Sequence, residues 1–202
     1  MKLTDKIEIT CEDNMALMKR YPDNYFDLAI VDPPYKNDVS GLNAGINRNF
    51  IYSEFKAPNK EYITELFRVS KNQILWGFNY YLELLPNTDT VICWFKHQNG
   101  HFSECEYAWS SIKKSRLFDR SYQQDQFNKI HPTQKPVTLY KWILDKYAKQ
   151  GDKILDTHLG SGSIAIACHD YGFELTACEL DKEYYDASVK RIKNHISQQK
   201  LF

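Results

Sequence analysis

Short apolar runs alternate along this chain with segments whose apolar residues recur at helical spacing. The runs that predict β-strands cover residues 6–10, 26–31, 73–76, 90–95, 153–156 and 173–178. The segments that predict helices begin at Asp13 or Asn14 and then cover residues 59–70, 80–85, 136–147 and 163–171. Strands and helices in alternation predict an α/β fold with a largely parallel sheet and helices on both faces.

The composition fits one domain in residues 1–202. Apolar residues make up 43% of the chain, enough to fill a core, and no internal repeat or linker interrupts the pattern. No apolar run approaches the roughly 20 residues that cross a bilayer, and the charged start is unlike a signal peptide, so we expect a cytoplasmic protein. The five cysteines are scattered without C-x-x-C spacing, which indicates neither disulfides nor a metal site.

The tetrapeptide Asp32-Pro33-Pro34-Tyr35 follows one of the predicted strands. Ligands of open α/β sheets bind at the carboxyl ends of strands, so this tetrapeptide is a candidate site. The Asp32 carboxylate and the Pro33 carbonyl are acceptors, the prolines lack N–H donors, and Tyr35 adds an aromatic ring. Such a set suits a flat base whose exocyclic amine donates to the acceptors while its ring stacks on Tyr35. The alternative is an ordinary proline-rich turn. Residues 37–49, rich in Asn and Gly, predict a mobile loop beside it.

A second candidate site follows the predicted strand that ends at Asp156. A tight loop with Gly160 and Gly162 leads into a helix, and the next strand ends at Glu179. In such a βαβ unit the loop backbone approaches a nucleoside and the acid accepts from its ribose hydroxyls. Ala165 stands where the dinucleotide fingerprint has its third glycine, which disfavours nicotinamide cofactors. A nucleoside cofactor without a pyrophosphate, such as S-adenosylmethionine, fits better.

The two sites together resemble the amino-methyltransferases of DNA, in the arrangement where the catalytic motif precedes the cofactor motif. Asp32-Pro33-Pro34-Tyr35 is similar to the family's catalytic motif, and residues 156–163 are similar to its D-P-F-x-G-S-G-T cofactor loop. Residues 131–136 are similar to its H-P-T-Q-K-P stretch, which borders the methionine end of the cofactor. Residues 76–80 and 94–96 also look like family segments. The resemblance covers most of the chain.

The resemblance implies a Rossmann-like fold and a metal-free, S-adenosylmethionine-dependent transfer of a methyl group to DNA. The implied catalytic residues are Asp32, Pro33, Pro34 and Tyr35. The implied cofactor-binding residues are Asp13, Asp32, Lys135, Asp156, His158, Gly160, Ser161, Gly162, Ser163 and Glu179. Among these, Glu179 is expected to hold the ribose and Asp13 to lie near the adenine.

The expected target is the N6 amine of adenine, because family members with Asp at position 32 more often resemble adenine enzymes. The N4 amine of cytosine is the alternative. Two readings from other classes stay open: a methyltransferase of structured RNA, and a catalytically silent nucleic-acid-binding protein that keeps the fold. An appended RNA-binding module would favour the first, and loss of Asp32 or Tyr35 would favour the second, but the sequence has neither feature.

The chain departs from the family pattern in two respects. Thr157 and His158 stand where the family has Pro and Phe. His158 has three interpretations: a packing imidazole, which we favour, a contact to the methionine carboxylate, or a mark of weakened cofactor affinity. Only residues 96–135 lie where larger members carry a target-recognition domain. We therefore expect short or relaxed target recognition, aided by loops, a homodimer or a partner subunit.

The equal numbers of basic and acidic residues argue against a broadly basic surface, but one segment combines basic with aromatic side chains. The basic residues predicted to contact DNA phosphates are Lys113, Lys114, Arg116 and Arg120. The alternative is a solvated surface stretch.

Overall fold

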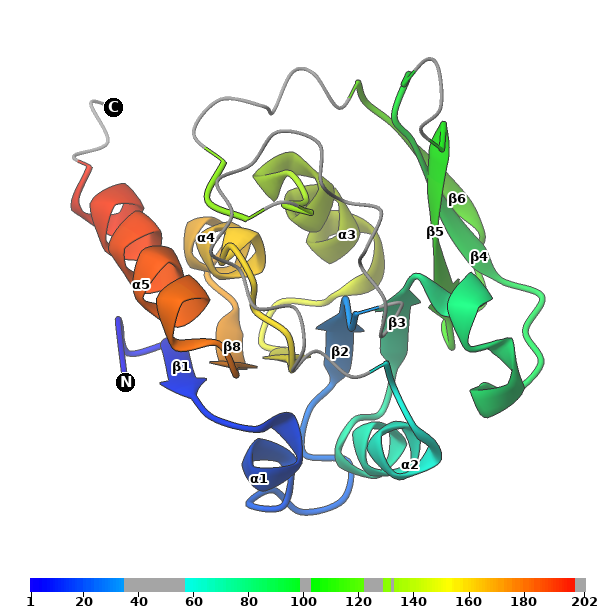
Figure 1. The fold of residues 1–202 in the computed structure, drawn as a ribbon, viewed down its shortest axis with the longest axis horizontal. Helices are drawn as coiled ribbons and strands as arrows, with labels where there is room; N and C mark the ends of the chain where they lie inside the picture. The colour runs from blue at the N-terminus through cyan, green and yellow to red at the C-terminus, as the bar shows by residue number, and fades with distance from the viewer. Residues whose placement is uncertain (35–56, 99–102, 122–128, 132, 199–202) are drawn as a thin grey trace.

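The computed structural model describes residues 1–34, 57–98, 103–121, 129–131 and 133–198. Within these residues one sheet has the strand order β1-β8-β7-β2-β3-β5-β4-β6 (Figure 1). Its strands are β1 (Ile7–Cys11), β2 (Leu28–Val31), β3 (Gln73–Trp76), β4 (Val91–Phe95), β5 (Cys105–Ser110), β6 (Arg116–Asp119), β7 (Lys153–Asp156) and β8 (Glu174–Glu179).

Most neighbouring strands are parallel. β1, β8, β7, β2 and β3 pair in parallel. β5 lies antiparallel between β3 and β4, and β6 is parallel to β4. All described strands except β5 therefore end at the same edge of the sheet, the edge where ligands of α/β folds bind. The predicted largely parallel sheet is confirmed, with one reversed strand that the sequence pattern did not reveal.

Helices cover both faces of the sheet (Figure 1). On one face lie α1 (Asn14–Met18) and α2 (Lys60–Val69), and on the other α3 (Val137–Tyr147), α4 (Ser163–Tyr171) and α5 (Lys182–Ser197). Successive side chains of β2 lie on opposite faces of the sheet. Ile30 packs with the layer of α3, α4 and α5, while Ala29 and Val31 pack with the layer of α1 and α2. The α/β, Rossmann-like architecture expected from the sequence is confirmed.

Three regions differ from the predicted elements. The helix expected at residues 80–85 is instead two 3₁₀ turns, η2 (Phe78–Tyr80) and η3 (Leu82–Leu84). Tyr81 lies between them with φ −148°, and its buried hydroxyl donates to the Trp76 carbonyl. In the segment expected to serve target recognition, residues 96–135, β5 and β6 are integral strands of the main sheet. Beyond the last predicted strand, α5 adds a helix that we did not predict.

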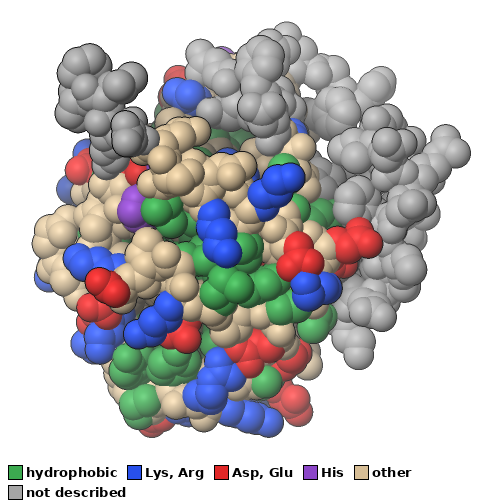
Figure 2. All heavy atoms as spheres, turned by 90° about the vertical axis from the view of Figure 1, so that its left-hand side faces the viewer, with side chains coloured by type: hydrophobic (Ala, Val, Ile, Leu, Met, Phe, Trp, Pro, Cys, Tyr) green, Lys and Arg blue, Asp and Glu red, His purple; other side chains and the backbone are tan. Residues whose placement is uncertain are grey.

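No helix in the described part of the chain is long and apolar enough to cross a membrane. In the same residues, no three His, Cys, Asp or Glu side chains gather as a metal site requires. On the face that carries α5 and the N-terminus, Lys and Arg side chains are interspersed with Asp and Glu (Figure 2). The described surface on that side does not present the continuous basic area that a DNA backbone would favour.

Candidate functional site

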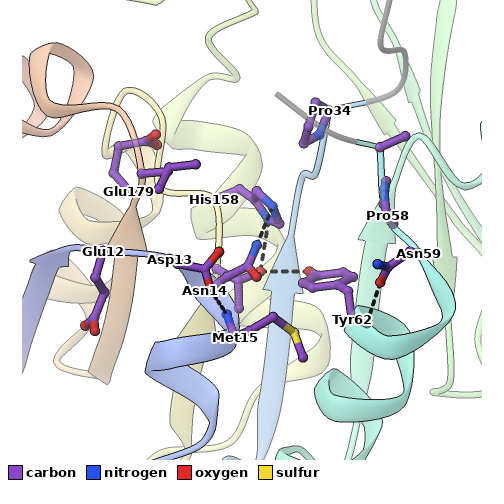
Figure 3. A pocket seen from close by; sticks show the side chains of 13 residues that line it. Glu12, Asp13, Asn14, Met15, Pro34, Pro58, Asn59, Tyr62, His158 and Glu179 are labelled. Atoms are coloured by element: carbon purple, nitrogen blue, oxygen red, sulfur yellow. Dashed lines mark hydrogen bonds between the residues drawn. The ribbon is translucent and has the colours of Figure 1, made fainter. Parts of the chain in front are cut away.

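A cavity of about 270 Å³ opens at the carboxyl ends of β1, β2, β7 and β8 (Figure 3). This volume is close to the lower end of the range for small-molecule sites, about 300 to 1,000 Å³. Its walls also include the start of α1 and of α2. The lining residues are Glu12, Asp13, Asn14, Met15, Pro34, Ala57, Pro58, Asn59, Tyr62, Thr157, His158, Glu179 and Leu180. Three predicted cofactor residues, Asp13, His158 and Glu179, are therefore brought together.

Glu179 ends β8 and is only 5% exposed. Its Oε2 accepts from the Gly160 N–H at 2.7 Å and its Oε1 from the Asp181 N–H at 3.1 Å. Burial raises the pKa of Glu179, although these backbone donors oppose the shift. The carboxylate therefore joins the loop after β7 to the start of α5 at the wall of the cavity.

The two acids that follow β1 differ in direction. Asp13 caps α1, and its Oδ1 accepts from the Met15 N–H at 2.9 Å and the Ala16 N–H at 3.1 Å. The Glu12 side chain points away from the other labelled groups (Figure 3) and forms an ion pair with Arg20 at 2.6 Å. Asp13 is the acid that faces the cavity.

His158 belongs to a chain of hydrogen bonds across the cavity wall (Figure 3). Tyr62 Oη lies 2.7 Å from Thr157 Oγ1, which lies 2.9 Å from His158 Nδ1. On the other side of the ring, His158 Nε2 lies 3.1 Å from Asn14 Nδ2. Burial lowers the pKa of His158 to about 3, so the ring is neutral at ordinary pH.

Because the His158 ring is neutral, only one of its nitrogens can donate a hydrogen bond. If the Asn14 amide donates to Nε2, the single ring proton resides on Nδ1 and is donated to Thr157. The ring also stands edge-on to Tyr62, with centroids 5.4 Å apart. The packing interpretation of His158 is thus incomplete, because both ring nitrogens have polar partners. A phenyl ring at this position would offer neither bond.

Asp156 ends β7 behind the cavity wall and is 2% exposed. It accepts from the His158 N–H at 3.0 Å. Burial raises its pKa to about 8, and the nearby carboxylates of Asp32 and Glu179 add to the shift. Asp156 does not line the cavity; it holds the first turn of the loop.

The predicted glycines and serines of the loop are not among the residues that line the cavity. Gly162 has φ +74°, and a Cβ there would lie 2.8 Å from Ile192 Cδ1 on α5. Ser161 and Ser163 bring their hydroxyls within 3.1 Å of each other, and Arg191 of α5 donates to the Ser161 carbonyl at 2.8 Å. Arg191 also donates to Ser163 Oγ at 3.0 Å. This part of the motif is occupied with packing α5 against the loop.

Asp32, directly after β2, belongs to a second cluster of side chains. The Lys135 ammonium donates to Asp32 Oδ2 and lies 3.2 Å from Glu106 Oε2. Lys96 in turn lies 3.1 Å from Glu106 Oε1. Lys135, predicted as a cofactor residue, is in contact with the predicted catalytic acid. Pro33 is buried and Pro34 joins the cavity wall, whereas Tyr35 and the loop at 37–49 lie outside the described residues.

The charges of this cluster support one another. Lys135 is 3% exposed, and burial alone would lower its pKa, but the carboxylates of Asp32 and Glu106 raise the pKa above its ordinary value. Burial likewise opposes ionisation of Glu106, but Lys135 and Lys96 hold its pKa below the ordinary value. Lys135 and Glu106 are therefore both ionised at neutral pH.

The stretch from His131 to Lys135 links the two clusters. The His131 ring packs against Tyr184 with centroids 4.3 Å apart, and a Cβ on Gly160 would lie 3.8 Å from it. Burial lowers the pKa of His131 to about 4, so the ring packs as a neutral group. Four residues later, Lys135 reaches Asp32.

The four residues predicted to contact DNA are spread along β6 and the turn before it. Lys113 and Lys114 lie in the turn before β6, where Ser111 N–H donates to the carbonyl of Gln73 at the start of β3. Arg120 follows the other end of β6, four residues beyond Arg116 and about 13 Å from it at a strand's rise. Of the four, Arg120 lies beyond the strand ends at the edge that carries Asp32, while the two lysines lie near the opposite edge.

Sequence reasoning missed Glu106, Lys96, Asn14 and Tyr62. A signal for Glu106 was present, because residues 105–110 have the alternating pattern of a strand. Glu106, Ala108 and Ser110 would lie on one face and Trp109 on the other. Asn14 and Tyr62 carry no comparable signal, because their meeting with Thr157 and His158 depends on how the helices pack.

A family model for N6/N4 methyltransferases, described as DNA methylase, matches residues 82–190, more than half of the chain. The type II methyltransferase M.HpaI of Haemophilus parainfluenzae is 21% identical over 236 residues, which covers 94% of this chain and 75% of that protein. The putative methylase YubD of Escherichia coli strain K12 is 23% identical over 208 residues, which covers 89% of this chain and 87% of that protein.

Two solved structures have a similar fold. The M1.HpyAVI–SAM complex has a TM-score of 0.64 at 18% identity, covering 91% of this chain and 98% of that one. The PvuII DNA methyltransferase, cytosine-N4-specific, has a TM-score of 0.66 at 13% identity, covering 96% and 93%. At these identities the likeness shows a shared fold.

Proposed function

This chain belongs to the N6/N4 DNA methylase family, and we propose that it transfers a methyl group from S-adenosylmethionine to the N6 amine of adenine in DNA. The observation that carries the proposal is the position of Pro34. This residue belongs to the acceptor sequence that begins at Asp32, and it also lines the cavity that contains Asp13, His158 and Glu179. A methyl donor in the cavity would therefore lie next to the groups proposed to hold the accepting amine.

The cavity fits a nucleoside cofactor by size and by its polar groups. Glu179 would accept hydrogen bonds from ribose hydroxyls with the lone pairs that its backbone donors leave available. Asp13 and Asn14, at the start of α1, would hold the base end. Among the described residues, the lining includes no Lys or Arg for a pyrophosphate, in keeping with a mononucleoside group. When bound, S-adenosylmethionine supplies a methyl group on a positively charged sulfur.

Asp32 and the Pro33 carbonyl would prepare the amine for attack. An exocyclic amine is a poor nucleophile because its lone pair is conjugated with the ring. By accepting the amine hydrogens, Asp32 and Pro33 would direct that lone pair toward the methyl group and stabilise the positive charge that develops on nitrogen. Lys135 fixes the direction of the Asp32 carboxylate. We propose that Tyr35 stacks on the extruded base.

The choice of adenine rests on the acid at position 32, and cytosine N4 stays the second candidate. The PvuII enzyme, which is described as cytosine-N4-specific, has a similar fold, and that likeness supports keeping this candidate. Both bases offer an exocyclic amine to the same acceptors. The difference lies in the ring atoms beside the amine, which other parts of the site must read.

The test is to incubate the protein with isotope-labelled S-adenosylmethionine and with single-stranded and double-stranded DNA of mixed sequence. After digestion, we expect the label in N6-methyladenine. Structured RNA serves as the competing substrate. Label in N4-methylcytosine alone would overturn the choice of base, label in RNA alone would overturn the choice of DNA, and no methylated nucleoside would overturn the enzyme assignment.

A further inference from the structure

Glu106 is the one acid that the Lys135 and Lys96 ammonium groups share among the described residues. Its Oε2 lies 3.2 Å from Lys135 and its Oε1 lies 3.1 Å from Lys96. Lys135 also contacts Asp32. The order Asp32, Lys135, Glu106, Lys96 thus alternates negative and positive groups, and the four charges sum to zero.

Without Glu106, the same cluster would hold two ammonium groups against one carboxylate. Lys135 and Lys96 are both buried, 3% and 7% exposed, so water would screen the excess charge only weakly. A net positive cluster beside Asp32 would oppose any positive charge that forms on a group bound to Asp32. It would also draw the Asp32 carboxylate more strongly onto Lys135.

The proposed reaction creates such a charge. The amine nitrogen becomes positive as its bond to the methyl carbon forms and the methyl–sulfur bond breaks, with the electron pair of that bond leaving on sulfur. The nitrogen then releases a proton to solvent water, which leaves the methylated amine neutral. The acceptors that stabilise this state work best when the charge behind them is neutral or negative.

We propose that Glu106 is a positioning residue that keeps Asp32 effective as the amine acceptor, by balancing the buried Lys135 and Lys96. This inference rests on the proposed methyl transfer. The Glu106 carboxylate pairs with Lys135, and Lys135 contacts Asp32, so Glu106 acts through Lys135 on Asp32. Its effect falls on the transition state, and therefore on kcat rather than on cofactor affinity.

The test compares three variants in single-turnover and steady-state methylation assays. E106Q keeps the shape and an acceptor oxygen but removes the charge, and we expect kcat to fall about tenfold or more, which corresponds to about 1.4 kcal/mol in the barrier. The KM for S-adenosylmethionine should stay within about twofold. E104Q is the matched control: Glu104 is exposed two residues earlier, so its loss should leave kcat unchanged.

The double variant E106Q/K96M separates charge balance from structural support. It removes one acid and one ammonium group, so the cluster is neutral again, and we expect kcat to recover to at least about a third of the wild-type value. A structural role for Glu106 predicts instead that the second substitution worsens the first. If E106Q alone does not fold, the double variant carries the test, and a tenfold loss in kcat there overturns the proposal.

Different results would overturn the methyltransferase assignment and the role of Glu106. A wild-type protein that methylates no nucleic acid overturns the methyltransferase assignment, and the inference on Glu106 falls with it. An active wild type whose E106Q variant keeps full kcat overturns only the role of Glu106. Loss of cofactor affinity in E106Q with an unchanged kcat would do the same.

Discussion

The acids in the two halves of the site are held in different ways. On the side of β7 and β8, backbone N–H groups hold Asp13, Asp156 and Glu179. On the side of β2 and β5, ammonium groups hold Asp32 and Glu106. The first group depends on the shape of loops and helix starts, and the second depends on counter-charges that come from distant parts of the chain.

The difference matches what each half is proposed to do. Most of the cofactor does not change during the reaction, so it needs hydrogen-bond acceptors in fixed positions. Backbone N–H groups hold the acidic side chains in such positions. An acceptor for a reacting amine must respond to charge that forms during the reaction, and paired ammonium groups set the electrostatic background for it. Changing one acid from each half should therefore affect different steps.

The largest expected effect follows from Asp32→Ala, on the lysine-held side. We expect kcat to fall at least a hundredfold, about 3 kcal/mol, because one acceptor of the transition state is lost. Affinity for S-adenosylmethionine, measured by calorimetry, should change little. The matched control is Asp27→Ala at the other end of the same strand, where the acid binds Lys71 and should not affect turnover. Near-normal turnover of Asp32→Ala would remove this residue from the mechanism.

A smaller effect, on binding instead of turnover, is expected on the backbone-held side. Glu179→Ala should weaken S-adenosylmethionine by about 1 to 3 kcal/mol, because charge-assisted bonds to the ribose are lost. Glu12→Ala is the control, since Glu12 lines the same cavity but its carboxylate pairs with Arg20. Calorimetry measures the affinity of both variants for S-adenosylmethionine. If the Glu179→Ala variant binds as tightly as the Glu12→Ala variant, Glu179 only holds the loop.

The buried Asp156 gives a prediction on pH. Its pKa in the folded protein is about 8, above the ordinary value, so between about pH 5 and 7 the folded state keeps a proton that the unfolded state has released. The contribution of this group to stability therefore falls as pH rises, by about 1.4 kcal/mol per pH unit.

Asp156→Asn has no such proton and isolates the effect. Urea unfolding of both proteins at pH 5, 6 and 7 should show the variant gaining stability relative to the wild type as pH rises. His131 and His158 titrate in both proteins, so their contributions cancel in the difference. A constant difference across this range would mean that Asp156 is ionised in the folded protein.

The smallest expected effect per residue concerns the basic residues of β6 and its turn. If Arg120 contacts a phosphate, Arg120→Gln should flatten the slope of log affinity against log salt on duplex DNA by about 0.9. Lys113→Gln/Lys114→Gln should leave the slope unchanged, because these lysines lie near the opposite edge of the sheet from Asp32. The reverse result would place the DNA along the turn before β6.

The sequence by itself determined the elements that local chemistry specifies. Apolar runs predicted six of the strands, Gly172 ends α4 in the left-handed conformation that glycine favours, and Asp13 caps α1. The order of the motifs also indicated which strand ends carry Asp32, Asp156 and Glu179. Each of these features depends on residues that are close together in the sequence, so the sequence pattern is enough to predict it.

Only the tertiary structure decided which side chains meet. Lys135, predicted as a cofactor residue, contacts Asp32, 103 residues away in the chain, and Glu106 joins them from a strand that runs antiparallel to its neighbours. Tyr62 reaches Thr157 across 95 residues. Such pairings depend on strand order and helix packing, which residue spacing does not encode.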